Sequence, residues 1–187
     1  MITPTVYNAL RYARPPDGIR HYRFPVSTWK HFERLPRLPR GVLPVADSLC
    51  RFNPIHGQGM SSASLQARLL QDVLDRVAAD ADPISALQTR FMAQVASVLE
   101  TPWIMSTSAD LAFPQTRGQR PSDFAEAQRF EAALFRAAVA DPVVHRALME
   151  VAQLLQPHHR LREPDIMRRI EAASPLTRTV VTRAEAA

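Results

Sequence analysis

Glycine is scarce in this sequence, which contains only five glycines among 187 residues. They stand at positions 18, 41, 57, 59 and 118, so the chain contains no G-x-G-x-x-G motif. That motif provides the tight turn and the close backbone approach by which a dinucleotide fold holds a pyrophosphate. The chain therefore lacks the part of a dinucleotide site that binds the phosphates.

Cysteine and lysine are nearly absent as well. The single cysteine, Cys50, excludes an internal disulfide and a cysteine-based metal cluster. The formal net charge is +5, but Lys30 is the only lysine, and the arginines are scattered rather than interleaved with aromatic residues. This pattern favours a compositional bias over a nucleic-acid surface.

Long apolar runs are also missing. No run approaches the roughly 20 residues that a helix needs to cross a bilayer, and Met1–Pro4 does not begin like a signal peptide. We therefore expect a cytoplasmic protein.

The patterning predicts a mainly α fold with a small β portion (α+β). Partly alternating apolar residues predict one strand over residues 19–26. A second strand is expected at residues 42–45, just before Asp47. Beyond them, helical spacing predicts helices that end near Val77, begin near prolines 83, 121 and 142, and run from Pro164 to Ile170. His158 and His159 lack partners at metal-ligand spacing and are expected in a solvated loop.

The most informative motif begins at Asp47 and ends at Met60. It combines an acidic residue after an expected strand with Gly57 and Gly59 at the start of an apolar-periodic helix. A carboxylate in this place can accept hydrogen bonds from ribose or ribityl hydroxyls. Glycines let backbone N–H groups approach an anionic or electron-rich ligand. The motif predicts a loop that contacts a cofactor.

This motif resembles the third FAD-binding motif, G-D-x(n)-P-x-x-G-x-G, of the FAD-dependent aromatic hydroxylases and epoxidases related to p-hydroxybenzoate hydroxylase. The chain departs from it at Ala46, where the family has glycine. It also departs at Pro44, because proline cannot donate to a strand ladder. Similarity to one bacterial branch extends over roughly residues 19–170 and includes the segments Arg23–Pro25, Asn53–Pro54, Thr101–Trp103, Asp110–Pro114 and Asp141–Val144.

The resemblance implies that the chain is the C-terminal part of an FAD-dependent monooxygenase with an FAD/NAD(P)-binding Rossmann-like fold. In such an enzyme NAD(P)H supplies electrons, and reduced FAD forms a C4a-hydroperoxide that inserts oxygen into an aromatic or alkene small molecule. The missing G-x-G-x-x-G would belong to an N-terminal half, which could be encoded separately. We expect the chain alone to be inactive.

The same resemblance divides the chain into four parts. Residues 1–45 would be a strand-containing segment from the substrate and FAD domain, and residues 46–80 the third FAD-contact motif with its helix. Residues 81–173 would form a C-terminal helical region and residues 174–187 a flexible tail.

The resemblance assigns FAD contacts to Asp47, Pro54, Gly57, Gln58, Gly59 and Met60. Asp47 would bind a ribityl hydroxyl, and the helix N-terminus would face the flavin N1 and C2 carbonyl, where negative charge accumulates. His56, Trp103 and Phe113 would line the substrate pocket. The simpler reading of these residues is structural: a turn cap, a tight turn or core packing. No spacing identifies a catalytic residue or a metal ligand.

Two other classes of function stay open. The chain could be an inactive truncated remnant that binds a protein through the apolar surface left by a missing domain. A neighbouring reading frame with G-x-G-x-x-G would argue against that remnant. Less favoured is a basic helical nucleic-acid-binding domain, which a strongly salt-dependent DNA affinity would support.

Overall fold

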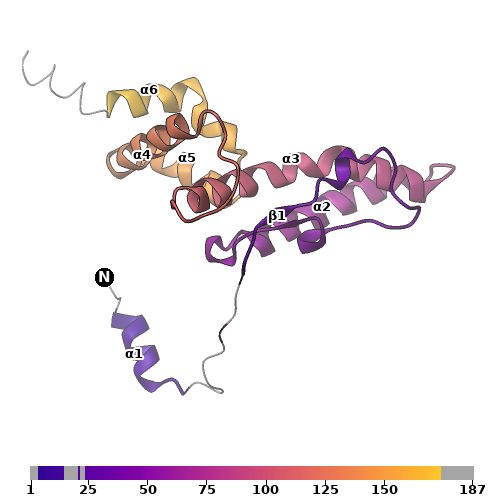
Figure 1. The fold of residues 1–187 in the computed structure, drawn as a ribbon, viewed down its shortest axis with the longest axis horizontal. Coiled ribbons are helices and arrows are strands. Elements are labelled where there is room, and N and C mark those ends of the chain that lie inside the picture. Colours follow the sequence, from indigo (N-terminus) through magenta and orange to yellow (C-terminus); the bar gives the residue numbers. More distant parts are fainter. Residues whose placement is uncertain (1–3, 15–20, 22–23, 174–187) are drawn as a thin grey trace, which may run out of the picture.

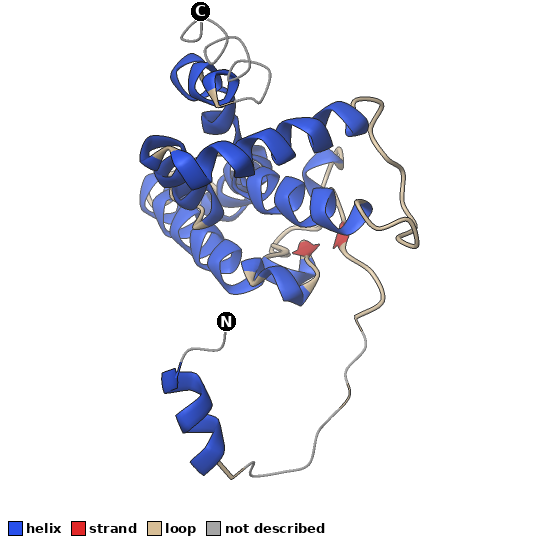
Figure 2. Cartoon of the chain, turned by 90° about the vertical axis from the view of Figure 1, so that its left-hand side faces the viewer, coloured by secondary structure: helices blue, strands red, loops and turns tan. Residues whose placement is uncertain are grey.

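The computed structural model describes residues 4–14, 21 and 24–173. In this part of the chain the fold is mainly helical, with one two-stranded antiparallel sheet (Figures 1 and 2). The mainly α expectation with a small β portion is therefore confirmed. The elements are α1 (Pro4–Tyr12), β1 (Thr28–Trp29), η1 (Phe32–Arg34), η2 (Ala46–Ser48), β2 (Cys50–Arg51), η3 (Pro54–His56), α2 (Gln58–Val77), α3 (Pro83–Leu111), α4 (Phe124–Ala140), α5 (Pro142–Ala152), η4 (His158–Arg162) and α6 (Pro164–Ala172).

The sheet lies elsewhere than the sequence pattern predicts. Strands β1 and β2 pair with Thr28 opposite Arg51 and Trp29 opposite Cys50. The expected strand at 42–45 is wrong, and so is the end of the other expected strand, because residues 24–26 are irregular. Pro25 and Pro44 stand in these segments, and a proline has no N–H for a ladder. Residues 19, 20, 22 and 23 lie outside the described residues.

A helical hairpin of α2 and α3 forms the centre of the molecule, and Figure 1 shows the two helices side by side. Asp82 caps α3 by accepting a hydrogen bond from the Ser85 N–H at 3.3 Å, with Pro83 in the first turn. The helix expected from Pro83 onwards continues through Pro102 to Leu111. This extension carries α3 past the end of α2 to the C-terminal helices.

Two hydrophobic cores lie along α3. The first, the hairpin core, joins α2 and α3 to the β2 region and contains the buried residues Leu49, Cys50, Phe52, Phe91, Met92, Val95 and Leu99. The second, the C-terminal core, is formed by α4, α5, η4 and α6, and includes Leu134, Val144, Val151 and Ile166. Helix α1 lies apart from both in the two views.

Helices α5 and α6 begin at the predicted prolines, Pro142 and Pro164, whereas α4 begins at Phe124 rather than at Pro121. Asp141 caps α5 by accepting hydrogen bonds from the N–H groups of Val143 at 2.8 Å and Val144 at 3.4 Å. The solvated loop expected at His158 and His159 is wrong. These residues open η4, and the half-buried His158 donates its backbone N–H to Thr101 Oγ1 at 2.9 Å. None of the described helices has the length and apolar character of a membrane span.

Candidate functional site

The glycine loop, residues 53–60, turns the chain from β2 into α2. Asn53 caps η3 by accepting a hydrogen bond from the Ile55 N–H, and Gly57 follows in the left-handed region at φ 67°. A side chain disfavours that conformation, which explains glycine at position 57. Gly59 is different, because it lies inside α2 without a positive φ.

Asp110, near the end of α3, holds this loop in place. Its Oδ1 atom accepts a hydrogen bond from Asn53 Nδ2 at 2.9 Å and lies 3.0 Å from His56 Nε2. His56 and Asp110 are both about four-fifths buried. Since residues 53 and 56 lie on one side of Gly57 and α2 begins on the other, the contacts to Asp110 fix the backbone that leads into the helix.

Asp47 lies in the short helix η2, not at the end of a strand, and its side chain is exposed. The preceding residue, Ala46, has a positive φ of 50°. Its N–H donates to Gln66 Oε1 at 2.8 Å, and Gln66 Nε2 in turn donates to Ser62 Oγ at 3.2 Å. Gln66 and Ser62 are buried in α2, so α2 itself holds the turn that carries Asp47.

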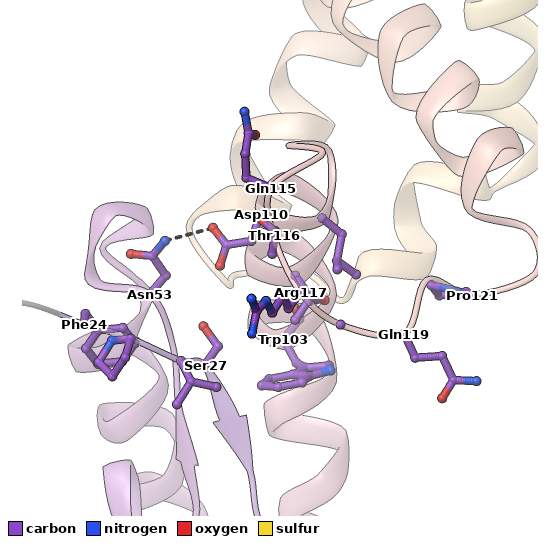
Figure 3. A pocket seen from close by; sticks show the side chains of 15 residues that line it. Phe24, Ser27, Asn53, Trp103, Asp110, Gln115, Thr116, Arg117, Gln119 and Pro121 are labelled. Carbon is purple, nitrogen blue, oxygen red and sulfur yellow. Dashed lines mark hydrogen bonds between the residues drawn. The ribbon is translucent and has the colours of Figure 1, made fainter.

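A cavity of about 810 Å³ opens beside the glycine loop, and we call it the loop cavity. Figure 3 shows Asn53 and Phe24 on one side of it and Asp110, Arg117 and Trp103 on the other. Such a volume lies within the range of small-molecule sites. The other lining residues come from α3 and from segments 25–27 and 115–121.

Trp103 is both a cavity wall and a packing residue. Its ring meets Trp29 edge-on at 5.7 Å between centroids and lies 6.5 Å from Phe52. Of the three residues expected in the substrate pocket, Trp103 lines the loop cavity, whereas His56 and Phe113 lie outside the lining. Asn53 is the glycine-loop residue that lines it, and Phe113 is 64% exposed. The core-packing alternative for Phe113 is therefore wrong.

The exposed apolar residues of the loop face solvent. Ile55 is 81% exposed and Met60 is 85% exposed. A Cβ added at Gly57 or Gly59 would meet no atom within 4 Å, so the described residues leave open space around the start of α2.

Cys50 is no nucleophile here. Burial, together with the charges of Asp47 and Glu33, raises the pKa of its thiol to about 12. A thiol in that state carries almost no thiolate at neutral pH. Among the described residues, no group of three or more His, Cys, Asp and Glu side chains is arranged to hold a metal ion.

Sequence reasoning missed the role of Asp110, although the segment that contains it is part of the resemblance. Its partners, Asn53 and His56, precede it by 57 and 54 positions in the sequence. No helical or strand periodicity links such distant positions. Gln66 was missed for a different reason: a glutamine inside an amphipathic helix is usually exposed.

Comparison with known proteins gives one curated relative. No family model matches the chain. Over 121 residues the chain is 34% identical to "Protein Rv3254" of Mycobacterium tuberculosis, an alignment that covers 61% of this chain. It covers 25% of the mycobacterial protein, so the chain spans about a quarter of the length of this relative.

Proposed function

We propose that this chain is the C-terminal part of an FAD-dependent monooxygenase of the p-hydroxybenzoate-hydroxylase-like family, built on an FAD/NAD(P)-binding Rossmann-like fold. In the complete enzyme FAD, reduced by NAD(P)H, supplies the oxygen-inserting chemistry on an aromatic or alkene small molecule. The short span relative to the mycobacterial protein agrees with a partial enzyme.

One observation carries the proposal: a single helix, α2, supports both halves of the motif. Its N-terminus carries the glycine loop, and its buried Gln66 binds the turn that carries Asp47. Gln66 lies eight residues beyond Gln58, which is about 12 Å along a helix. A ligand with a ring system at one end and a polyhydroxyl chain at the other can bridge this span.

The residues present fit half of an FAD site. The exposed Asp47 carboxylate is free to accept a ribityl hydroxyl, and the open space at Gly57 and Gly59 leaves the first N–H groups of α2 accessible. Pro54, Gln58 and Met60 would complete this side of the flavin. The part of the chain that the structure describes offers no glycine-rich turn for the pyrophosphate, which would therefore bind to an N-terminal half of the enzyme outside this sequence.

The loop cavity is the proposed substrate site. Trp103 and Phe24 provide apolar walls, whereas Asn53 and Asp110 place hydrogen-bonding groups at the end nearest the glycine loop. His56 would help to hold the Asp110 carboxylate in place rather than act on the substrate directly. In this proposal the chain positions the substrate beside the flavin and excludes water from the site.

The first test is flavin binding by the chain alone and with its missing half. The purified chain should be colourless, and co-expression with the product of the reading frame directly upstream should yield a yellow complex. A stoichiometric flavin on the isolated chain would contradict the division of the site. An upstream product without G-x-G-x-x-G, or a colourless complex, would contradict the proposal.

The second test compares three loop variants in the complex. Asp47→Ala should weaken FAD binding by about 1.5 to 3 kcal/mol, the value of a hydrogen bond to a charged group. Gly59→Val should weaken it more, because its side chain would enter the space proposed for the flavin. His56→Phe should leave flavin affinity nearly unchanged. The reverse order of FAD dissociation constants would show that the cofactor does not lie on this loop.

One observation favours the alternative of a protein-interaction module. Ile55 and Met60 of the glycine loop are largely exposed. Exposed apolar side chains of this kind can mark a surface that a partner protein covers. A partner that binds the chain without any flavin would support this alternative.

A further inference from the structure

A second cavity lies between α3 and the C-terminal helices. Its volume is about 380 Å³, which is within the range of small-molecule sites. We call it the interhelix cavity. Its apolar walls come from α3 and α4. The α3 residues are Trp103, Ile104 and Leu111, and the α4 residues are Phe124, Ala127 and Phe130.

This cavity marks the place where the two hydrophobic cores fail to merge. Trp103 packs against the hairpin core, whereas Phe130 packs against the C-terminal core. The side chains that face the cavity therefore lack partner atoms on one side and forgo dispersion contacts. A ligand of matching shape would supply those contacts.

Three of the polar groups at the cavity have partners in the protein. The Arg162 guanidinium lies 4.3 Å from the centroid of the Phe130 ring. Glu131 accepts a hydrogen bond from Gln128 Nε2 at 3.3 Å, and the Thr107 hydroxyl donates to the Trp103 carbonyl at 2.7 Å. Asp123 and Arg162 also line the cavity, but both are exposed to solvent, and neither forms an ion pair with another described residue.

Two ionisable groups at the cavity are partly buried. Burial raises the pKa of the Glu131 carboxyl and lowers the pKa of His158, so both groups are pushed towards their neutral forms. A charged ligand would lose hydration against the apolar walls, which is costly. The surroundings favour a ligand without charge.

We propose that the interhelix cavity binds a neutral, mostly hydrocarbon ring compound of the size of a bicyclic or caged hydrocarbon. This site requires no flavin and does not rest on the proposed function. Trp103, Thr107, Leu111 and Pro121 also line the loop cavity, so a ligand in one cavity touches a wall of the other.

The test uses 1-adamantanol as the probe and Trp103 as the reporter. Trp29 and Trp103 are the two tryptophans of the chain, so Trp29→Phe leaves Trp103 as the only indole. Titration of the full chain should give a saturable change in indole emission, and calorimetry of the wild-type chain should give the same dissociation constant.

Two variants fill the cavity from opposite walls. Ala127→Phe on α4 and Ile104→Phe on α3 should each weaken 1-adamantanol binding at least about tenfold. Ala132→Phe, at an exposed position of α4, is the matched control and should bind like wild type. Circular dichroism establishes that each variant is folded. If a filling variant unfolds, an NMR titration of the wild-type chain is used instead. 1-Adamantanol should then shift the amide signals of Ile104 and Ala127.

Adamantane-1-carboxylate tests the preference for a neutral ligand and should bind at least about tenfold more weakly than the alcohol. Equal affinity for the carboxylate would overturn the preference for a neutral compound. The site itself would be refuted by the absence of saturable 1-adamantanol binding, by unchanged affinity in both folded filling variants, or by amide shifts elsewhere.

Discussion

At the scale of single residues, polar side chains hold the irregular segments of the site. Asp110 binds both Asn53 and His56 through one carboxylate oxygen. Charge-assisted hydrogen bonds of this kind are stronger than neutral ones and more directional than apolar contacts. Asp110 is therefore the residue that sets the shape of the glycine loop.

Asp110→Leu should loosen the glycine loop. Loss of both hydrogen bonds should speed amide exchange of Ile55, His56 and Gly57 by about tenfold or more, since each bond is worth about 1 kcal/mol or more. Asp110→Asn keeps an acceptor oxygen and should retain most of the protection. Hydrogen exchange measured by NMR checks the result. Equal exchange in wild type and Asp110→Leu would show that the loop holds its shape without this carboxylate.

Glu131→Gln should stabilise the chain at neutral pH. Because burial raises the folded-state pKa of Glu131 above its ordinary value of 4.5, the folded chain binds this proton more tightly than the unfolded chain. The contribution of protonated Glu131 to the free energy of unfolding is fully present below about pH 4.5 and is lost as pH rises through the folded pKa. The gain from Glu131→Gln should thus be present at pH 7 and shrink towards pH 4.

Urea unfolding at the two pH values measures this difference. Glu126→Gln, at an exposed position of the same helix, is the control and should give no comparable gain. A Glu131→Gln variant less stable than wild type at pH 7 would contradict the expectation.

At the scale of secondary-structure elements, two buried glutamines join irregular chain to helices. Gln66 on α2 binds the Ala46 N–H. Gln88 on α3 donates to the carbonyls of Pro39 at 2.8 Å and Val42 at 2.7 Å, and accepts from the Gly41 N–H at 3.3 Å. These side chains satisfy backbone groups that a strand ladder would otherwise pair.

Gln88→Leu should destabilise the chain by about 2 to 4 kcal/mol, because it removes three hydrogen bonds and leaves partly buried backbone groups without partners. Gln71→Leu, at an exposed position of α2, is the matched control and should change stability by less than about 0.5 kcal/mol. Chemical denaturation gives both values. Similar losses in the two variants would mean that the Gln88 bonds contribute little.

At the scale of the whole molecule, α3 connects two cores, and the glycine loop leaves apolar side chains uncovered. Ile55 and Met60 lie close in sequence at the start of α2 and are both more than four-fifths exposed. Large exposed apolar side chains favour association. The chain should therefore self-associate when it is alone.

Sedimentation velocity over a range of concentrations tests this expectation. The double variant Ile55→Ser and Met60→Ser should shift the distribution towards monomer. Val139→Ser removes an equally exposed apolar residue, 91% exposed on α4, and should leave association unchanged. A monomeric wild-type chain at all concentrations, with a sharp two-state melt, would show that this surface is stable without a partner.

The sequence by itself determined helices α2, α3, α5 and α6 and the proline starts of the last three, because caps and apolar periodicity are local. Asp82 and Asp141 cap their helices through residues two or three positions away, and Gly57 supplies a positive φ within its own turn. The resemblance likewise marked the glycine loop. Only the tertiary structure decided the strand pairing, the contacts of Gln66, Gln88 and Asp110, and the two cavities. Each of these depends on side chains brought together from distant positions, where the position of one helix relative to another, rather than local propensity, determines the contact.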